Sequence, residues 1–324
     1  MTLPIFERGL WSVVVAAVAC SPLICSAADA ESLKPVPAVQ SPIATQSPVL
    51  SAAWAGKRVV TVGANGVVLL SDDAGRSYRQ AKSVPVSSTL TSTSFPTSNL
   101  GWAVGHWGAI LNTNDGGETW KVQRLDTSED RPLFAVDFTD EQHGVAVGLW
   151  SLVLTTDDGG KTWQERQILT KAGKKSDANL LGIFSDRKGS IYATAEKGQV
   201  FRSTDHGHNW DAIETGYKGS LWTGAVLEDG AILVGGQRGT LMRSADGGRT
   251  WVTIPLGTKN SVTTISEQGK AVLVGGLDGL QMLSHDRGLS FSSAPKQSGE
   301  SVTVALPRSE SEWLLFSRRG VVQQ

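Results

Sequence analysis

The sequence predicts an all-β fold, a seven-bladed propeller built from one repeated unit. Three observations lead to this fold class: a short acidic motif recurs six times, a glycine-centred hairpin marker recurs at the same spacing, and short β-rich runs fill the intervals. The spacing, 40 to 47 residues, is the size of a four-stranded propeller blade. The chain of 324 residues therefore suits one closed repeat domain.

The acidic motif has the pattern Ser or Thr, any residue, Asp, any residue, Gly, two further residues and an aromatic, as in Thr156 to Trp163. Its Asp residues are separated by 42, 43, 47, 41 and 40 residues. They are Asp73, Asp115, Asp158, Asp205, Asp246 and Asp286, and the matching aromatics are Tyr78, Trp120, Trp163, Trp210, Trp251 and Phe291.

Each unit contains four short runs that are typical of strands. In the second unit these runs are Thr91 to Phe95, Gly101 to Gly105, Ala109 to Thr113 and Trp120 to Arg124. Short β-rich runs that end in Gly and polar turns indicate strands, and four of them make a blade.

A second marker lies between the second and third strands of each unit, where glycine can supply the positive φ of a tight hairpin. The markers follow one another at intervals of 42, 43, 47, 41, 40 and 41 residues, which defines seven units. They are Gly66, Gly108, Ser151, Gly198, Gly239, Gly279 and Gly320.

The seventh unit contains only three predicted strands, 301–306, 312–316 and 321–324. A blade without its outermost strand leaves an open edge. Residues 31–48 are rich in Pro, which an outermost strand tolerates. We therefore expect 31–48 to act as linker and closing outer strand of a single domain, 31–324.

The first thirty residues differ from the rest. Arg8 precedes an apolar run from Leu10 to Ala19, and small residues follow, which predicts a signal peptide over 1–30. Both cysteines, Cys20 and Cys25, lie in this segment, so the mature chain would have no thiol chemistry. An alternative is a lipoprotein cleavage site that leaves an acylated Cys20. We expect export to the periplasm or to a compartment like the thylakoid lumen.

Composition and motifs exclude several functional classes. Charged residues make up 19% of the chain and the net charge is -1, so there is no global basic field for nucleic acid. The sequence contains no phosphate loop and no dinucleotide fingerprint, and its histidines lack the spacing of a metal site. We expect no cofactor and no metal.

The repeated Asp has a structural explanation. An Asp in a tight turn can accept hydrogen bonds from backbone amides, and the following Gly takes the strained backbone position. The aromatic residue is large enough to fill the space between neighbouring blades. With one Asp per blade around a ring, these carboxylates cannot converge as a catalytic pair does.

The unit as a whole, Gly101 to Gly105, then Gly108, then Thr113 to Trp120, resembles the Asp-box or bacterial neuraminidase repeat. It is most similar to the photosystem II stability and assembly factor family of cyanobacteria and plastids, which has exported bacterial relatives. The resemblance covers 49–324 and implies a seven-bladed propeller that assists assembly of a membrane protein complex without catalysis. In a photosynthetic host that complex would be photosystem II, and elsewhere an unspecified periplasmic partner.

A glycan-binding or sialidase-like propeller is the alternative. A sialidase would have an Arg-Ile-Pro motif, which is missing here. The acidic residues that could be proposed as catalytic are Asp137, Asp140, Glu141, Glu228 and Asp229, all at ordinary turn and surface positions. We therefore expect no enzyme, and in the glycan alternative Trp107 and Trp150 would stack on sugars.

We expect the binding surface on the face opposite the Asp motifs, where the hairpins between second and third strands lie. Trp and Arg at turn tips are enriched in protein interfaces. An insertion, Leu169 to Asn179, is expected as a surface loop on the same face without a core role. The candidate binding residues are His106, Trp107, Trp150, Lys197, Arg238, Arg318, Arg319, Lys171, Lys174 and Lys175.

We expect a monomer whose partner is a protein, namely an integral membrane protein or complex. Contact with the membrane itself would be indirect unless Cys20 is acylated. The competing interpretation of the candidate face is that Trp107 and Trp150 only cap the central channel and that the arginines are solvated.

Overall fold

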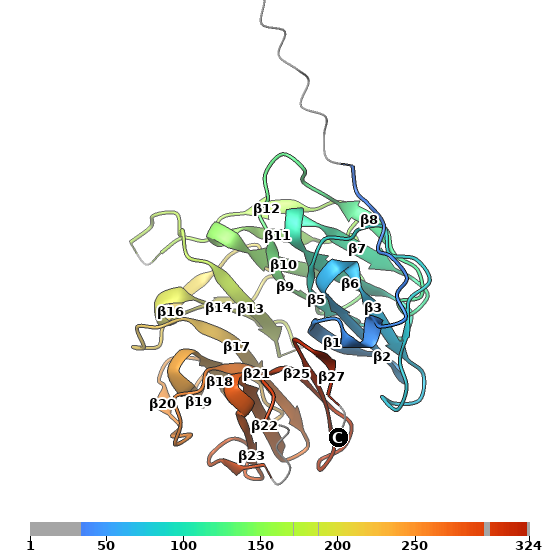
Figure 1. The fold of residues 1–324 in the computed structure, drawn as a ribbon. Helices are drawn as coiled ribbons and strands as arrows, with labels where there is room; N and C mark the ends of the chain where they lie inside the picture. The colour runs from blue at the N-terminus through green and yellow to red at the C-terminus, as the bar shows by residue number, and fades with distance from the viewer. Residues whose placement is uncertain (1–33, 171, 187, 295–298, 323–324) are drawn as a thin grey trace, which may run out of the picture. The chain divides into compact units, whose positions relative to one another are not determined.

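The computed structural model describes residues 34–170, 172–186, 188–294 and 299–322. The signal peptide predicted for 1–30, with Cys20 and Cys25, lies outside these residues. From Lys34 onward the chain forms one compact unit, made of seven antiparallel sheets (Figure 1). Within the described part of the chain, no helix combines the length and the apolar character needed to span a bilayer.

Each sheet is a meander of consecutive strands, as the sequence predicts. The first three blades consist of β1 (Val49–Ala55), β2 (Arg58–Gly63), β3 (Val68–Ser71) and β4 (Arg79–Gln80); β5 (Leu90–Ser94), β6 (Gly101–Gly105), β7 (Ile110–Thr113) and β8 (Lys121–Arg124); and β9 (Leu133–Phe138), β10 (Gly144–Gly148), β11 (Val153–Thr156) and β12 (Gln164–Arg166). The next two consist of β13 (Leu180–Ser185), β14 (Ile191–Ala195), β15 (Gln199–Ser203) and β16 (Asp211–Glu214); and β17 (Leu221–Val226), β18 (Ile232–Gly236), β19 (Leu241–Ser244) and β20 (Val252–Thr253). The last two consist of β21 (Val262–Gln268), β22 (Ala271–Gly276), β23 (Gln281–Ser284) and β24 (Ser292–Ser293); and β25 (Val302–Pro307), β26 (Trp313–Ser317) and β27 (Gly320–Val321).

The first strand of every blade is the innermost. Neighbouring first strands contact one another around the ring, and β25 contacts β1, so the ring is closed. This arrangement confirms the prediction of a seven-bladed all-β propeller.

The hydrophobic core is divided among the spaces between blades. Seven clusters of buried residues occupy the seven seams. The seam between blades 1 and 2, for example, combines Val60 and Leu70 with Ala103, Leu111 and Trp120. A propeller therefore has a ring of small cores rather than one large core.

The aromatic residue of each Asp motif packs between neighbouring blades, as predicted, and the structure places it in the seam before its own blade. Trp120 meets the ring of Phe95 edge-on at 6.0 Å, and Trp163 meets Phe138 at 5.9 Å. Tyr78 meets Phe316 of the last blade at 6.1 Å, across the closure of the ring. Trp210, Trp251 and Phe291 pack against the clusters of the three other seams that have a motif.

Blade 7 has no Asp motif, so the seam between blades 6 and 7 receives no motif aromatic. Trp313, at the start of β26, fills it instead, and it is buried in the same cluster as Leu273 and Val302. This substitution keeps the seam packed although the unit that would supply its aromatic is incomplete.

The prediction that the N-terminal segment adds a closing outer strand to the last blade is wrong for the described residues. The last sheet has three strands, and the segment from Ala44 to Gln46 forms a short 3-10 helix, η1. The ring closes through side chains: Thr303 Oγ1 donates to Val49 O at 2.6 Å, and Trp54 Nε1 donates to Pro307 O at 2.8 Å. The physical reason is that the first and last inner strands already meet, so no shared strand is needed.

The N-terminal segment takes the position of a loop that links two blades. A Cβ on Gly320 would lie 1.9 Å from Thr45 O, and a Cβ on Gly66 would lie 2.0 Å from Val86 O in the equivalent loop of blade 1. Ala38 N also donates to Val84 O at 3.0 Å. Residues 34–48 are thus held along blades 1 and 7 without forming a strand.

Each Asp motif forms the same hydrogen-bonded turn. In blade 5, Ser244 Oγ and Thr250 N donate to Asp246 Oδ1 at 2.8 Å each, while Thr250 Oγ1 donates to Asp246 Oδ2 at 2.6 Å. Gly248 N donates to Ser244 Oγ at 2.8 Å. The polar residue four positions after the Asp was not part of the predicted pattern. It is Ser77, Thr119, Thr162, Asn209, Thr250 or Ser290, and its side chain bonds the second carboxylate oxygen in every blade that has the motif.

These bonds stabilise the ionised carboxylate. Hydrogen bonds from the side chain and backbone of Thr250 and from Ser244 lower the pKa of Asp246 to about 2. Bonds from the Ser284 and Ser290 side chains likewise lower the pKa of Asp286 to about 2. Carboxylates whose pKa is lower in the folded state stabilise the fold above their unfolded pKa and lose that contribution as the pH falls.

We expect the thermal midpoint to fall as the pH is lowered from about 4 to about 2, the range between the usual Asp pKa and that of Asp286. Asp286→Asn should lower the midpoint at pH 7 by a few degrees, because an amide nitrogen cannot accept from the Ser290 hydroxyl. The variant should also lose part of the acid-induced decrease. Scanning calorimetry of the parent and the variant at pH 7 and over the range from about pH 4 to about pH 2 measures both the loss of midpoint and the acid-induced decrease. An unaltered midpoint of the variant at pH 7 would contradict the role assigned to Asp286.

Trp102 provides a test of the seam cores. Its side chain is fully buried and stacks on Phe138 with ring centroids 3.5 Å apart. Trp102→Ala should cost about 3–5 kcal/mol of unfolding free energy, because it leaves a cavity in the seam. Val252→Ala, at an exposed position on β20, is the matched control and should change stability by about 0.5 kcal/mol at most. Denaturant titration of both variants measures the two changes in unfolding free energy, and equal changes would contradict a dominant role of the seams in stability.

Candidate functional site

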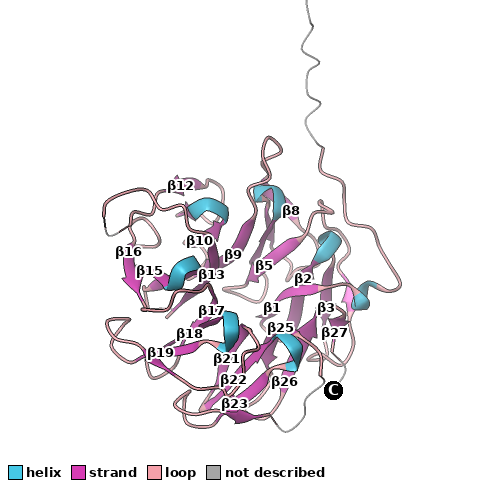
Figure 2. Ribbon diagram, turned by 60° about the vertical axis from the view of Figure 1, so that its left-hand side comes forward, coloured by secondary structure: helices cyan, strands magenta, loops and turns pink. Residues whose placement is uncertain are grey.

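The turns that join second and third strands surround one end of the channel (Figure 2). We call this end, with the loops that connect one blade to the next, the hairpin face. The Asp motifs join third and fourth strands and therefore lie at the opposite end of each antiparallel blade. Six of the turns are short 3-10 segments: η2 (Ala64–Gly66), η3 (His106–Gly108), η4 (Leu149–Ser151), η5 (Glu196–Gly198), η6 (Gln237–Gly239) and η7 (Leu277–Gly279).

The two central residues of these six turns have positive φ, which is the geometry of a type I′ hairpin turn. The predicted marker is the second of the two, and all seven markers, Ser151 and Gly320 included, have positive φ. Glycine is needed at most of them because a connecting loop approaches closely, as Tyr217 O does to within 2.1 Å of a Cβ on Gly198. Ser151 instead places its Oγ 2.9 Å from both Ser176 Oγ and Ala178 O.

The first central residue is not glycine in any of the six turns, so a full side chain occupies left-handed backbone. Trp107 has φ 60° and ψ 30°, and Trp150 has φ 53° and ψ 45°. A bulky residue in this region is strained and persists only where its surroundings hold it. The tips are thus features that the fold imposes.

A side chain from the next connecting loop holds the backbone amide of four tips. Asp130 Oδ1 accepts from Trp107 N at 2.7 Å, and Asn179 Oδ1 accepts from Trp150 N at 3.0 Å. The other two are Arg238 N to Ser261 Oγ at 3.3 Å and Asp278 N to Ser301 Oγ at 2.9 Å. These four tips are therefore preorganised by the loop that follows their blade.

The candidate residues on the hairpin face differ in accessibility. Trp150 exposes 52% of its surface, and Lys197, Arg238, Arg318 and Arg319 are exposed as well. His106 and Trp107 are half-buried, and His106 Nδ1 lies 3.0 Å from Asp130 Oδ2. Of the three candidate lysines, Lys174 and Lys175 are exposed, and Lys171 lies outside the described residues.

The insertion 169–179 has more structure than we expected. Ser176 and Ala178 are buried, and Ala178 belongs to the core cluster between blades 3 and 4. Ser151 N donates to Ala178 O at 2.9 Å, so the insertion supports the turn that presents Trp150. The expectation that it has no core role is wrong for these two residues.

Beside Trp150 lies an open pocket of about 400 Å³. Its charged lining includes Arg131, whose Nη2 lies 3.4 Å from Glu165 Oε1, together with Lys175 and Asp177. The exposed indole is thus surrounded by charges of both signs, a setting found at polar rims of protein interfaces.

A group of residues on this face was missed in the sequence. The second residue of the innermost strand forms a β-bulge in all seven blades. In blades 2, 6 and 7 it is Thr91, Thr263 or Thr303, whose Oγ1 donates to the first carbonyl of the next inner strand. In blades 1, 3, 4 and 5 it is Leu50, Phe134, Leu181 or Trp222. Aligning the units on their first strands could have found the position, but not the bulge.

The acidic residues considered for catalysis lie in separate places. Asp140 accepts from His143 N and Gln142 N in a turn of blade 3. Asp229 pairs with Arg243 at 3.0 Å in blade 5, and Glu228 N donates to Glu267 Oε2 at 2.8 Å. Burial raises the pKa of Glu267, and the neighbouring Glu228 and Asp229 carboxylates add to this shift.

A contact between two histidines was also not predicted. His143 and His206 stack with ring centroids 4.0 Å apart at the seam between blades 3 and 4. His208 Nε2 lies 3.1 Å from Asp157 Oδ1 nearby. Among the residues that the structure describes, no three His, Cys, Asp or Glu side chains are arranged to hold a metal ion.

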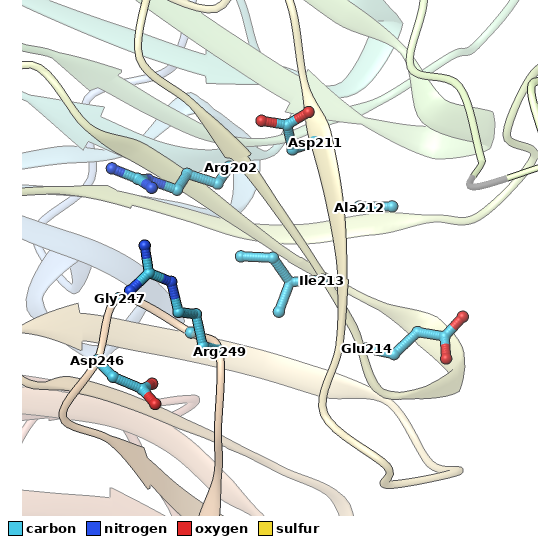
Figure 3. A pocket seen from close by; sticks show the side chains of 9 residues that line it. Arg202, Asp211, Ala212, Ile213, Glu214, Asp246, Gly247 and Arg249 are labelled. Atoms are coloured by element: carbon cyan, nitrogen blue, oxygen red, sulfur yellow. The ribbon is translucent and has the colours of Figure 1, made fainter.

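A further pocket, of about 330 Å³, lies between β16 and the Asp motif of blade 5 (Figure 3). The carboxylates of Asp211, Glu214 and Asp246 stand at separate edges of it (Figure 3), and that of Asp246 is committed to its own turn. Arg202 donates to Ser190 Oγ at 3.2 Å and lies 5.9 Å from the ring centroid of Tyr192. These groups do not present a converging catalytic pair.

Together the seven blades and six Asp-motif turns define the molecule as a seven-bladed Asp-box propeller. The family model described as photosynthesis system II assembly factor YCF48 matches residues 80–232, which confirms the resemblance inferred from the repeat. No curated protein matches the chain.

Two of the solved structures that are similar to this chain show the shared fold. One is described as YCF48 bound to D1 peptide, with a TM-score of 0.69, 18% identity, and coverage of 87% of this chain and 94% of that one. The other is YCF48 from Cyanidioschyzon merolae, with a TM-score of 0.68, 16% identity, and coverage of 87% and 96%. At this identity the similarity establishes the fold.

The strain at Trp150 gives a prediction about stability. Blade 1 has Asn65 at the equivalent left-handed position, with φ 57°, and Asn tolerates this region well. Trp150→Asn should therefore raise the unfolding free energy by about 1 kcal/mol, because the exposed indole makes no core contact that would be lost. Chemical denaturation measures the change, and a destabilised variant would show that the indole supports the fold.

Proposed function

We propose that this protein is an exported, non-catalytic assembly or accessory factor that docks a segment of a membrane protein complex on its hairpin face. The observation that carries the proposal is Trp150, a residue 52% exposed whose strained backbone is held by a hydrogen bond from its amide to Asn179 Oδ1 of the next loop. Strain that the surroundings maintain at an exposed aromatic tip is typical of a binding site.

The similarity to known proteins also supports the proposal. The matching family model is described as an assembly factor of photosystem II, and one protein of the same fold is described as bound to a D1 peptide. In a photosynthetic host the partner would accordingly be a subunit of photosystem II. In another host it would be a periplasmic or membrane partner reached after export.

A non-catalytic role fits the state of the acidic residues. The six repeated Asp side chains are each bound within their own turn, one in each of six blades. Carboxylates held in this way support turns and are spread around the ring, whereas glycoside hydrolysis requires two that face each other.

Co-purification tests the proposal. A combined variant of the hairpin face should lose at least nine-tenths of the integral membrane protein that co-purifies with the tagged propeller from its own membranes, because the anchors of the interface are removed. The variant carries Trp107→Ala, Trp150→Ala, Arg238→Gln, Arg318→Gln and Arg319→Gln.

The matched control changes Lys57→Gln and Arg76→Gln, two exposed positions on the Asp-motif face, and should retain the partner. Both variants should keep the thermal midpoint of the parent within a few degrees. Undiminished partner recovery with the hairpin-face variant would refute the proposal. Binding of a glycan array by the parent but not by the variant would favour the sugar-binding alternative.

A further inference from the structure

Five large apolar side chains at the tips and β-bulges of blades 2 to 5 take no part in any seam core. They are all partly exposed, and none belongs to or packs against the seven buried clusters. We call them the apolar sector: Trp107, Phe134, Trp150, Leu181 and Trp222. Large apolar groups outside the core of a folded domain mark interaction sites when they lie together.

The fold brings these five residues to one side of the channel mouth. Each turn of the hairpin face contacts the inner strand of the next blade, so η3 meets β9, η4 meets β13 and η5 meets β17. The tip residues Trp107 and Trp150 therefore lie beside the strands that begin with Leu133 and Leu180. The bulges of those strands present Phe134 and Leu181, and Trp222 continues the row in blade 5.

The other side of the mouth has different chemistry. The bulge residues of blades 2, 6 and 7 are threonines whose hydroxyls are used between blades. Leu50, at the bulge of blade 1, is the one apolar bulge residue outside blades 3 to 5. The tips of blades 5 and 7 carry three arginines, which we call the basic sector: Arg238, Arg318 and Arg319. Arg319 Nη1 lies 3.7 Å from Glu300 Oε1, whereas Arg238 and Arg318 form no salt bridge with the described residues.

Acidic groups offset only part of the charge of the basic sector. Glu196, at the tip of blade 4, accepts hydrogen bonds from the backbone and side chain of Asn179. Asp278 is the remaining acidic tip, and it lies on blade 6 between the arginines of blades 5 and 7. The three arginines of the basic sector therefore outnumber the two acids beside them, Glu300 and Asp278.

We propose that the occupant of the hairpin face is an extended polypeptide segment that crosses the channel mouth in one direction. Its bulky aliphatic or aromatic side chains lie on the apolar sector, and its carboxylates lie on the basic sector. This inference rests on the proposed docking function and adds to it the chemistry and the orientation of the bound segment. Charge complementarity with the arginines selects a polypeptide rather than a neutral sugar.

Site-specific photo-crosslinking of the full-length protein in its own membranes tests the orientation. A benzophenone-bearing phenylalanine analogue replaces Trp150 or Trp222 in one set and Arg238 or Arg318 in another, with Arg76 on the opposite face as control. Mass spectrometry then identifies the crosslinked peptides. Crosslinks from the first set should lie at apolar residues of the partner. Crosslinks from the second set should lie in the same partner segment, beside Asp, Glu or a C-terminal carboxylate. The two groups of crosslinks should be within about ten residues of each other, because an extended chain advances about 3.3 Å per residue.

Two outcomes would overturn the inference. One is that the crosslinks from the two sets of positions map to different chains, or to polar segments without acidic residues. The other is a crosslink to lipid, accompanied by Trp150-dependent sedimentation with phosphatidylglycerol vesicles, which would make the apolar sector a membrane contact.

A substitution experiment separates this inference from the proposed function. Leu181→Gln with Trp222→Gln should reduce partner recovery at least tenfold, with the thermal midpoint unchanged, because neither side chain belongs to a seam core. Arg238→Gln with Arg318→Gln should weaken the salt dependence of recovery. If only the combined five-residue variant loses the partner, docking stands and the two-sector arrangement is wrong. If no variant loses it, both are wrong.

Discussion

The interaction on which the rest of this propeller depends is the packing of one aromatic side chain into the seam before its blade. A ring of sheets has no central core, so each seam must be filled separately. The Asp-motif turn serves this purpose: hydrogen bonds such as Thr250 N to Asp246 Oδ1 at 2.8 Å fix the turn from which Trp251 enters its seam. Where blade 7 lacks the motif, Trp313 fills the seam instead.

This constraint divides the two faces of the molecule between structure and binding. In blades 1 to 6 the Asp-motif end is committed to holding the seams, so its residues vary little from blade to blade. The turns at the other end need only a left-handed backbone pair, which leaves the side chain of the tip free to vary. Asn65, Trp107, Lys197 and Arg238 occupy the same backbone position with different chemistry.

The hairpin face is also more rigid than a set of surface loops. Asp130 and Asn179 hold the amides of Trp107 and Trp150, and the insertion before blade 4 supports the second of these turns through Ser176 and Ala178. Fixing exposed aromatic groups before binding reduces the entropy lost when a partner is ordered against them. The strained tips of blades 2 and 3 are thus fixed before a partner binds.

The sequence alone determined the seven units, the strand order, the two faces and the seam role of the aromatics, because each depends on a local pattern repeated about every forty residues. It also located the exposed tips, since turn positions follow from the same period. Only the tertiary structure decided how the ring closes, that Trp313 replaces a missing motif aromatic, and that Phe134, Leu181 and Trp222 reach the channel mouth. Those features depend on contacts between blades and on bulges that shift the side-chain alternation, and neither leaves a periodic signal in the chain.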